Sequence, residues 1–139
     1  MSYYDDELTK ALHKLKISYE KLEIREHDKL VSTINAVFPF SGSKISWEEM
    51  SDTTHFDTTS KQEAFSFITT KAIDTTKNVF LIGDSATNTI YKIKSLDLSL
   101  ALKELDEIPQ HSYVTPQNLD WIFCISMEGD IDFGLLPRL

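Results

Sequence analysis

Apolar residues recur at helical spacing in four segments of the chain. Two segments repeat the spacing 0, 3, 4, 7, which places apolar side chains on one face of a helix: Leu8, Ala11, Leu12 and Leu15, and Leu98, Ala101, Leu102 and Leu105. Acidic residues precede the first set, where negative charge favours the start of a helix. The pattern predicts helices over residues 5–15, 28–38, 62–72 and 95–107, with Pro39 and Pro109 stopping the second and fourth.

The second half of the chain contains short runs that are typical of strands. Residues 79–82 and 122–125 are continuously apolar, as in strands buried on both faces, and residues 131–135 alternate between apolar and polar. We expect strands at the following positions: 78–83, 89–94, 111–114, 121–127 and 131–135. The second of these strands is expected to form a hairpin with the first, across a turn that follows Gly83.

Three segments of the first half have weaker patterns. Residues 17–24 show a mixed period that fits either a strand or a continued helix. Residues 45–47 are expected to form a short strand. Residues 51–60 are rich in Ser, Thr and Asp, and this composition predicts a surface loop.

The order of the elements predicts the fold class. Helices come first, and strands with one intervening helix follow. This segregation predicts an α+β fold in which the N-terminal helices pack on a mostly antiparallel sheet formed by the C-terminal half. Because no linker, repeat or change in composition divides the chain, we expect one domain over residues 1–139.

The N-terminus and the single cysteine bear on the compartment. The first residues carry neither a basic region nor an apolar stretch, so we expect no secretory signal. The longest apolar runs are too short to cross a bilayer. Cys124 has no partner for a disulfide within the chain, which suits a reducing environment. These features predict a cytoplasmic protein without a membrane partner.

The formal net charge of −8 is unevenly distributed along the chain. Residues 95–139 contain eight acidic and two basic residues, and therefore hold −6 of the −8, whereas the first 94 residues are close to neutral. An acidic surface repels nucleic acid and anionic membranes, and it attracts basic partners. The charge therefore predicts either a basic protein partner or solubility alone.

A search for catalytic or cofactor-binding patterns finds none. Cys124 lies in an apolar strand, where a raised pKa and an inert thiol are expected. The four histidines are scattered and show no metal-ligand spacing. The four glycines are too few and too separated to form a phosphate-binding loop. We therefore expect neither an enzyme nor a cofactor.

Three alternating acids, Glu128, Asp130 and Asp132, form the most distinctive polar pattern. On a strand, residues two apart point the same way, so these carboxylates could form one negative stripe. Such a stripe is compatible with a charged turn beside an exposed strand, a surface for basic residues of a partner, a cation site, or an acid/base pair of the glycosidase type.

Part of the second half resembles a known family. The similarity lies in residues 80–84, 95–98, 108–114 and 120–134, above all in the P-Q-H-x-Y run from Pro109, in Trp121, and in the closing E-G-D-I-D-F-G run from Glu128. These segments resemble small immunity proteins of bacterial polymorphic toxin systems, including contact-dependent growth inhibition systems. The resemblance implies a protein that binds and neutralises one cognate toxin domain, often a basic nuclease, in the cell that produces it.

The shared motif itself is interpreted as scaffold. Trp121 is expected to anchor the core, His111 and Tyr113 to support the core or the turn, and Gly129 and Gly134 to serve backbone geometry. The toxin-facing residues are then expected among exposed acids, two of which lie within the closing run of the motif: Glu104, Asp106, Glu107, Asp130 and Asp132. Two alternatives remain open, namely an acidic adaptor or regulatory domain unrelated to a toxin, and a small enzyme that uses the carboxylates from Glu128 to Asp132.

Overall fold

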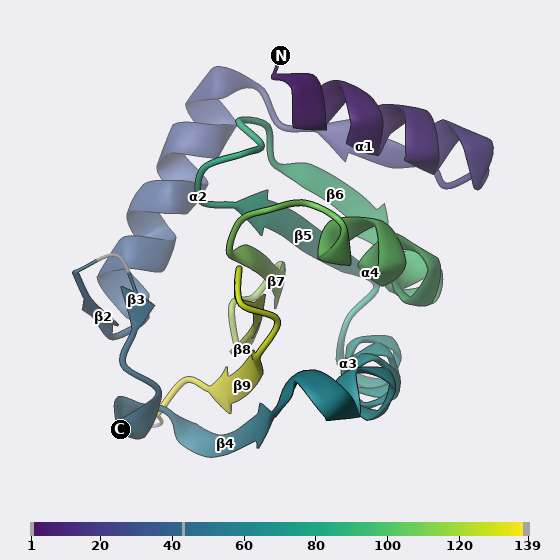
Figure 1. Cartoon of the computed structure of the whole chain (residues 1–139). Coiled ribbons are helices and arrows are strands. Elements are labelled where there is room, and N and C mark those ends of the chain that lie inside the picture. Colours follow the sequence, from purple (N-terminus) through teal and green to yellow (C-terminus); the bar gives the residue numbers. More distant parts are fainter. Residues whose placement is uncertain (1, 43, 138–139) are drawn as a thin grey trace.

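The computed structural model describes residues 2–42 and 44–137 (Figure 1). The helices are α1 (Tyr3–Lys14), α2 (Ile24–Val37), α3 (Lys61–Thr75) and α4 (Leu98–Asp106). The strands are β1 (Tyr19–Lys21), β2 (Phe40–Ser41), β3 (Lys44–Ile45), β4 (Ser51–Phe56), β5 (Asn78–Gly83), β6 (Tyr91–Lys94), β7 (Ser112–Pro116), β8 (Trp121–Ile125) and β9 (Ile131–Leu135). Short 3-10 turns span Trp47–Glu49, Thr58–Ser60 and Ser95–Asp97.

Seven strands form one sheet in the order β1-β6-β5-β7-β8-β9-β4, and all neighbouring strands in it are antiparallel. The five central strands come from the second half of the chain, and the two from the first half lie at the edges. The predicted α+β class is confirmed, and so is the predicted hairpin of β5 and β6. Strands β2 and β3 form a separate small hairpin.

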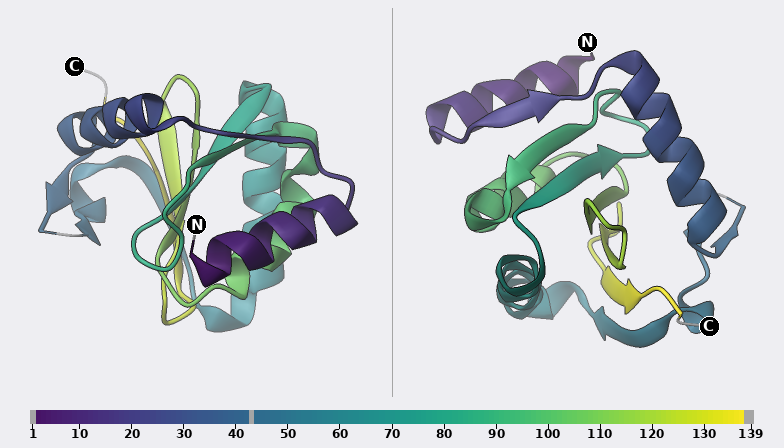
Figure 2. Two further views of the ribbon diagram at one scale, coloured as in Figure 1. Left: turned by 90° about the horizontal axis from the view of Figure 1, so that it is seen from above. Right: turned by 180° about the vertical axis from the view of Figure 1, so that it is seen from behind.

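Helices cover both faces of the sheet (Figure 2). The main core lies between one face and α1, α3 and α4, and a second core lies between the other face and α2 with the β2–β3 hairpin. Strand β5 shows why its sequence is continuously apolar: Leu81 packs into the main core, whereas its neighbour Ile82 packs against the second. Such a strand is buried on both sides and has no solvent-facing position to fill with a polar residue.

The prediction of a loop over residues 51–60 was wrong. Residues Ser51–Phe56 form the edge strand β4, which pairs with β9, and only the remainder is irregular or 3-10. Phe56 packs its ring against Phe67 of α3, with the centroids 5.7 Å apart, which anchors the strand on the core side. The strand bulges near Asp52, whose φ of 47° interrupts the regular pairing. The outward positions of an edge strand are polar, and this polarity concealed the strand in the sequence.

Several other boundaries differ from those expected: α3 extends to Thr75, and the strands expected over 89–94, 111–114 and 121–127 span Tyr91–Lys94, Ser112–Pro116 and Trp121–Ile125. Two more differences lie in the first half of the chain. The second helix begins four residues early, at Ile24, because the Glu26 carboxylate accepts a hydrogen bond from the Glu23 N–H at 3.5 Å and supplies the cap. The short strand expected over 45–47 ends at Ile45, and Trp47 opens a 3-10 turn. Within the described residues, no helix is both long and apolar enough to span a membrane.

Candidate functional site

The structure separates the five acids singled out by the sequence into two groups. Glu104 and Asp106 lie on α4, which covers the main core, and Glu107 caps its C-terminus. The Asp106 carboxylate is 3.0 Å from the ammonium nitrogen of Lys61. Glu104 and Glu107 line a hollow between α1 and α4 that Lys10 also lines. Asp106 therefore has a direct ion pair, whereas the hollow of Glu104 and Glu107 is also lined by Glu7 and Lys14 and holds three acids and two lysines.

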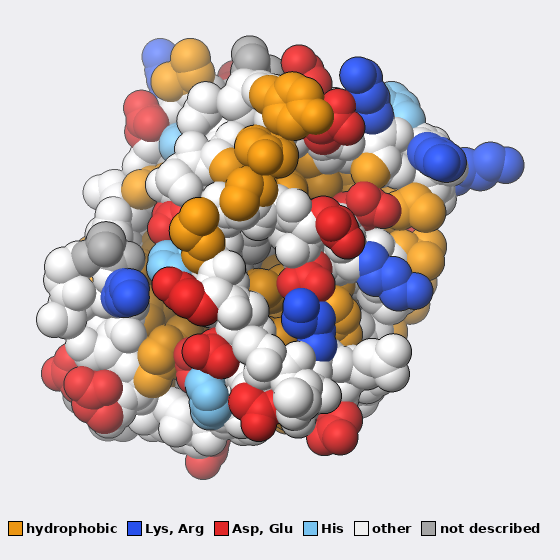
Figure 3. Space-filling model, viewed as in Figure 1, with side chains coloured by type: hydrophobic (Ala, Val, Ile, Leu, Met, Phe, Trp, Pro, Cys, Tyr) orange, Lys and Arg blue, Asp and Glu red, His pale blue; other side chains and the backbone are white. Residues whose placement is uncertain are grey.

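Asp130 and Asp132 lie on the opposite side of the sheet. Together with Glu128 they line a hollow of about 230 Å³, which we call the acidic hollow. It is bounded by the following residues: Lys44, Ile45, Trp47, His111, Tyr113, Cys124, Ser126, Glu128, Asp130 and Asp132. The expectation that the three alternating acids lie together is confirmed, although only Asp132 belongs to a strand. In the lower half of Figure 3, over β4 and β9, acidic side chains gather beside histidines.

Asp132 also forms a pair across the edge of the sheet. Its carboxylate oxygen is 2.8 Å from Nδ1 of His55 on β4, the residue directly opposite it in the strand register. Because a carboxylate only accepts, Nδ1 donates the proton in this hydrogen bond. The bond to Asp132, and to a lesser extent the nearby charge of Asp130, raises the pKa of His55 above its ordinary value.

The Glu128 carboxylate is held in its charged form. Its pKa lies below the ordinary value because it accepts hydrogen bonds from its own backbone N–H and from Ser126, with the nearby charge of Lys44 adding to the effect. Glu128 therefore contributes a negative charge to the acidic hollow at neutral pH.

Cys124 lies at the floor of the acidic hollow but does not act as an ionised group. Burial, together with the negative charge of Asp132, raises the pKa of its thiol to about 12, which confirms the raised pKa expected from the sequence. At neutral pH the thiol is protonated, so it is a poor nucleophile and a poor metal ligand. Among the described residues, no group of three His, Cys, Asp or Glu could hold a metal ion.

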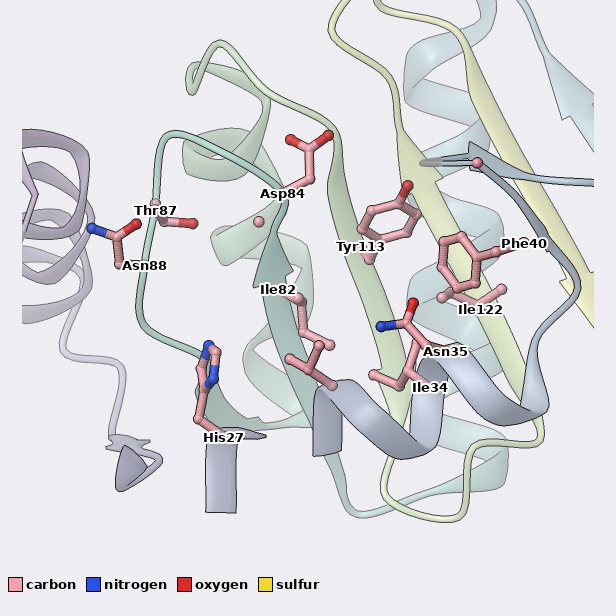
Figure 4. Close-up of a pocket in the computed structure, with 13 residues that line it drawn as sticks. His27, Ile34, Asn35, Phe40, Ile82, Asp84, Thr87, Asn88, Tyr113 and Ile122 are labelled. Atoms are coloured by element: carbon pink, nitrogen blue, oxygen red, sulfur yellow. The ribbon is translucent and has the colours of Figure 1, made fainter. Parts of the chain in front are cut away.

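A second cavity of about 370 Å³ lies beneath α2, and we call it the α2 cavity (Figure 4). Ile82, Tyr113 and Ile122 line it from the sheet, opposite Ile34 and Asn35 of α2. Its lining also includes His27, Val31, Phe40, Gly42, Gly83, Asp84, Thr87 and Asn88. The cavity thus has an apolar floor and a polar rim, which is the usual composition of a binding pocket.

The loop after β5 forms one wall of this cavity, and Gln110 holds it in place. The buried Gln110 side chain accepts hydrogen bonds through Oε1 from the N–H groups of Ala86 at 2.8 Å and Thr87 at 3.0 Å. Gly83 is required there because a Cβ at this position would collide with the Gln110 amide and with Thr87. This part of the P-Q-H-x-Y run therefore fixes a wall of the cavity.

Asp5 of α1 holds the far end of the same loop. Its buried carboxylate accepts hydrogen bonds from the N–H of Asn88 at 2.8 Å, the N–H of Thr89 at 3.3 Å and the hydroxyl of Tyr91 at 2.6 Å. Burial alone would raise the pKa of Asp5, but these bonds and those from Ser2 outweigh it and hold the pKa below 3.8. The loop is thus fixed at both ends by buried side chains.

Three further residues of the shared motif, Trp121, His111 and Gly129, have structural roles, as expected. Trp121 is buried in the main core and donates through Nε1 to the Thr75 hydroxyl at 3.1 Å. His111 accepts a hydrogen bond at Nδ1 from the Met127 N–H at 2.9 Å, which supports the turn before β9. Gly129 in that turn has a φ of +96°, a conformation that favours glycine.

Sequence reasoning missed the α2 cavity and the contribution of His55. The cavity is assembled from α2, β2, β5, β7, β8 and the loop after β5, which are far apart in the chain. His55 faces Asp132 only because β4 is a strand in a defined register. A strand at this position could have been predicted from the β-branched threonines and the phenylalanine in the segment Thr53-Thr54-His55-Phe56.

Comparison with known proteins gives no relative to set beside these features. No family model matches the chain, and no curated protein matches it in sequence. The acidic hollow, the α2 cavity and the motifs described above are therefore the features of this chain that bear on its function.

Proposed function

We propose that this protein binds a basic protein domain through the sheet face that carries the acidic hollow, and that this domain is a toxin which it neutralises in the producing cell. The observation that carries the proposal is the cluster of Glu128, Asp130 and Asp132 around one hollow. Such a cluster favours lysine and arginine side chains and speeds the encounter with a basic partner.

The choice of a toxin as the partner is supported by the resemblance in residues 80–134 to immunity proteins of polymorphic toxin systems. A nuclease toxin must carry positive charge to bind phosphates. A surface of fixed carboxylates can cover that positive charge and thereby compete with nucleic acid. Binding rather than catalysis is further supported by the neutral Cys124 thiol, which supplies no nucleophile at neutral pH.

The test is co-expression with the protein encoded immediately upstream of this chain, which we expect to carry a toxin domain at its C-terminus. Cells that produce the toxin domain alone should stop growing, and cells that also produce this chain should survive. The two proteins should co-purify with nanomolar affinity. Absence of both a complex and protection would overturn the proposal.

A different partner would support the adaptor alternative. In that case a pull-down from lysate would repeatedly recover one protein that is unrelated to the upstream product, and growth protection would not be observed.

A further inference from the structure

The α2 cavity is an unfilled apolar space beside a well-packed core. It opens to solvent, and an apolar cleft lined by a few polar groups is the usual form of a binding pocket. The α2 cavity measures about 370 Å³, enough for a large side chain. Helix α2, whose residues are all described, buries only Ile34 among its 14 residues, whereas the shorter α4 buries four. The inner side of α2 is therefore left partly open.

The α2 cavity and the acidic hollow are neighbours. Tyr113 lines both, and the β2–β3 hairpin also contributes to both, through Phe40 in one and Ile45 in the other. Four carboxylates line the two spaces together, and Lys44 is the one lysine or arginine among their described lining residues. A single chain segment could therefore place an apolar side chain on one side of Tyr113 and basic groups on the other.

We propose that the α2 cavity is the anchor pocket of the partner interface, and that it receives a leucine-sized or aromatic side chain flanked by lysine or arginine. This inference rests on the proposed function for the class of partner, a basic protein. The apolar side chain would contact Ile82 and Ile122, and the flanking cations would meet Asp84 at the rim and the acids beyond Tyr113.

The rigid wall of the cavity supports this role. Interface anchors bind best in pockets that are formed in advance, because less conformational entropy is lost on association. The Gln110 and Asp5 side chains fix the loop from Asp84 to Asn88. Asp84 is itself held, since its carboxylate accepts a hydrogen bond from the His111 N–H at 3.0 Å.

The first experiment uses short peptides and does not require the toxin. Three capped tripeptides are titrated into ¹⁵N-labelled protein: lysine-leucine-lysine, lysine-glycine-lysine and glutamate-leucine-glutamate. The lysine-leucine-lysine peptide should shift the amide signals of Ile82, Gly83 and Asp84. It should also bind about tenfold more tightly than the glycine peptide, because it alone combines an apolar side chain for the cavity with positive charges that complement the carboxylates. Equal binding of the three peptides, or shifts confined to other regions, would overturn the inference.

Variants then locate the binding in the cavity. Val31→Phe fills the cavity from α2 and should abolish the peptide shifts, whereas Val37→Phe, on the same helix at a position that does not line the cavity, should leave them unchanged. Asp84→Asn keeps the acceptor for His111 and should remove most of the preference for lysine over glutamate. If Val31→Phe proves unfolded, Asp84→Asn alone tests the inference. An unchanged preference of Asp84→Asn for the lysine peptide over the glutamate peptide would contradict the inference.

These experiments distinguish a failure of the anchor pocket from a failure of the proposed function. If the upstream protein does not bind but the peptides bind as described, the toxin assignment fails and the anchor pocket stands. If the toxin binds Val31→Phe and Asp84→Asn as tightly as the unmodified protein, the anchor pocket is wrong and the proposed function stands.

Discussion

At the scale of single residues, buried polar groups have more specific roles than the exposed acids that give the chain its charge. Asp5 is fully buried, yet it accepts hydrogen bonds from two backbone N–H groups and one tyrosine hydroxyl. It thereby connects the first helix to a loop more than 80 residues away in sequence. Its position in the first turn of α1 indicated only that negative charge favours a helix start, because its distant partners leave no local pattern in the sequence.

Replacing Asp5 by alanine should destabilise the protein by about 2–4 kcal/mol, because the buried Tyr91 hydroxyl and the N–H groups of Asn88 and Thr89 lose their acceptor. Chemical denaturation at pH 7 measures this loss. Asp6→Ala, at the exposed neighbouring position, is the matched control and should change stability by less than about 0.5 kcal/mol. An unchanged unfolding free energy for Asp5→Ala would contradict the assigned role.

The same carboxylate makes stability depend on pH. Its folded pKa lies below 3.8, so its contribution is complete above that pH, where it is ionised in both states. As pH falls below this value, Asp5 takes up a proton in the unfolded chain before it does so in the folded protein. The stabilisation that Asp5 supplies therefore decreases until the pH has passed below the pKa of the folded protein. Unfolding curves between pH 5 and pH 2.5 should therefore show a steeper loss for the unmodified protein than for Asp5→Asn.

The stability that the His55–Asp132 pair contributes depends on pH in the opposite direction. The folded pKa of His55 is raised above 6.5, so the pair contributes below that pH and its contribution disappears as pH rises through the folded value. An NMR titration should show the His55 pKa falling in Asp132→Asn, where the charged acceptor is lost. Asp52→Asn, on the same strand but without a hydrogen bond to His55, should have little effect. An equal shift in both variants would count against the pair.

At the scale of elements, the sequence predicted the segments whose apolar pattern is dictated by burial. Strands β5 and β9 have the predicted boundaries, and all four helices occur near their predicted positions. Strand β4 was missed because one of its sides faces solvent and its residues resemble those of a loop. The two groups of acids could not be separated from sequence alone, because nothing local indicates that α4 covers one face of the sheet while the Asp132 side chain points to the other.

The loop that forms the wall of the α2 cavity gives a prediction at this scale. Gly83→Ala should displace the Gln110 amide, lower the unfolding free energy by about 1–3 kcal/mol, and speed amide hydrogen exchange at residues 85–88. Gln110→Ala should produce the same faster exchange without a steric clash. Unchanged exchange in both variants would show that the wall does not depend on Gln110.

At the scale of the whole molecule, the net charge of −8 becomes informative once its positions are known. Asp106 is paired with Lys61, and Glu104 and Glu107 share their hollow with Glu7 and two lysines, whereas the acidic hollow is lined by three carboxylates and one lysine. The α2 cavity adds an apolar space beside this negative surface. The net charge alone indicated only that a partner would be positively charged. The positions of the acidic hollow and the α2 cavity indicate where that partner would bind.

Binding to the toxin domain should weaken as salt is raised, because exposed charge pairs are screened within about 8 Å at physiological ionic strength. Most of the change should appear in the association rate, which electrostatic steering controls. Stopped-flow measurements between 50 mM and 500 mM NaCl test this expectation. An association rate that does not change over this range would argue against an interface centred on the acids.

The most direct measurement is the affinity of the toxin domain for two matched double variants, determined by calorimetry. Asp130→Asn with Asp132→Asn removes two charges from the acidic hollow, and Glu104→Gln with Glu107→Gln removes two from α4. We predict that the first pair raises Kd by at least about tenfold and that the second changes it less than about twofold. Equal affinities for the two double variants, or a larger loss for the α4 pair, would contradict the account.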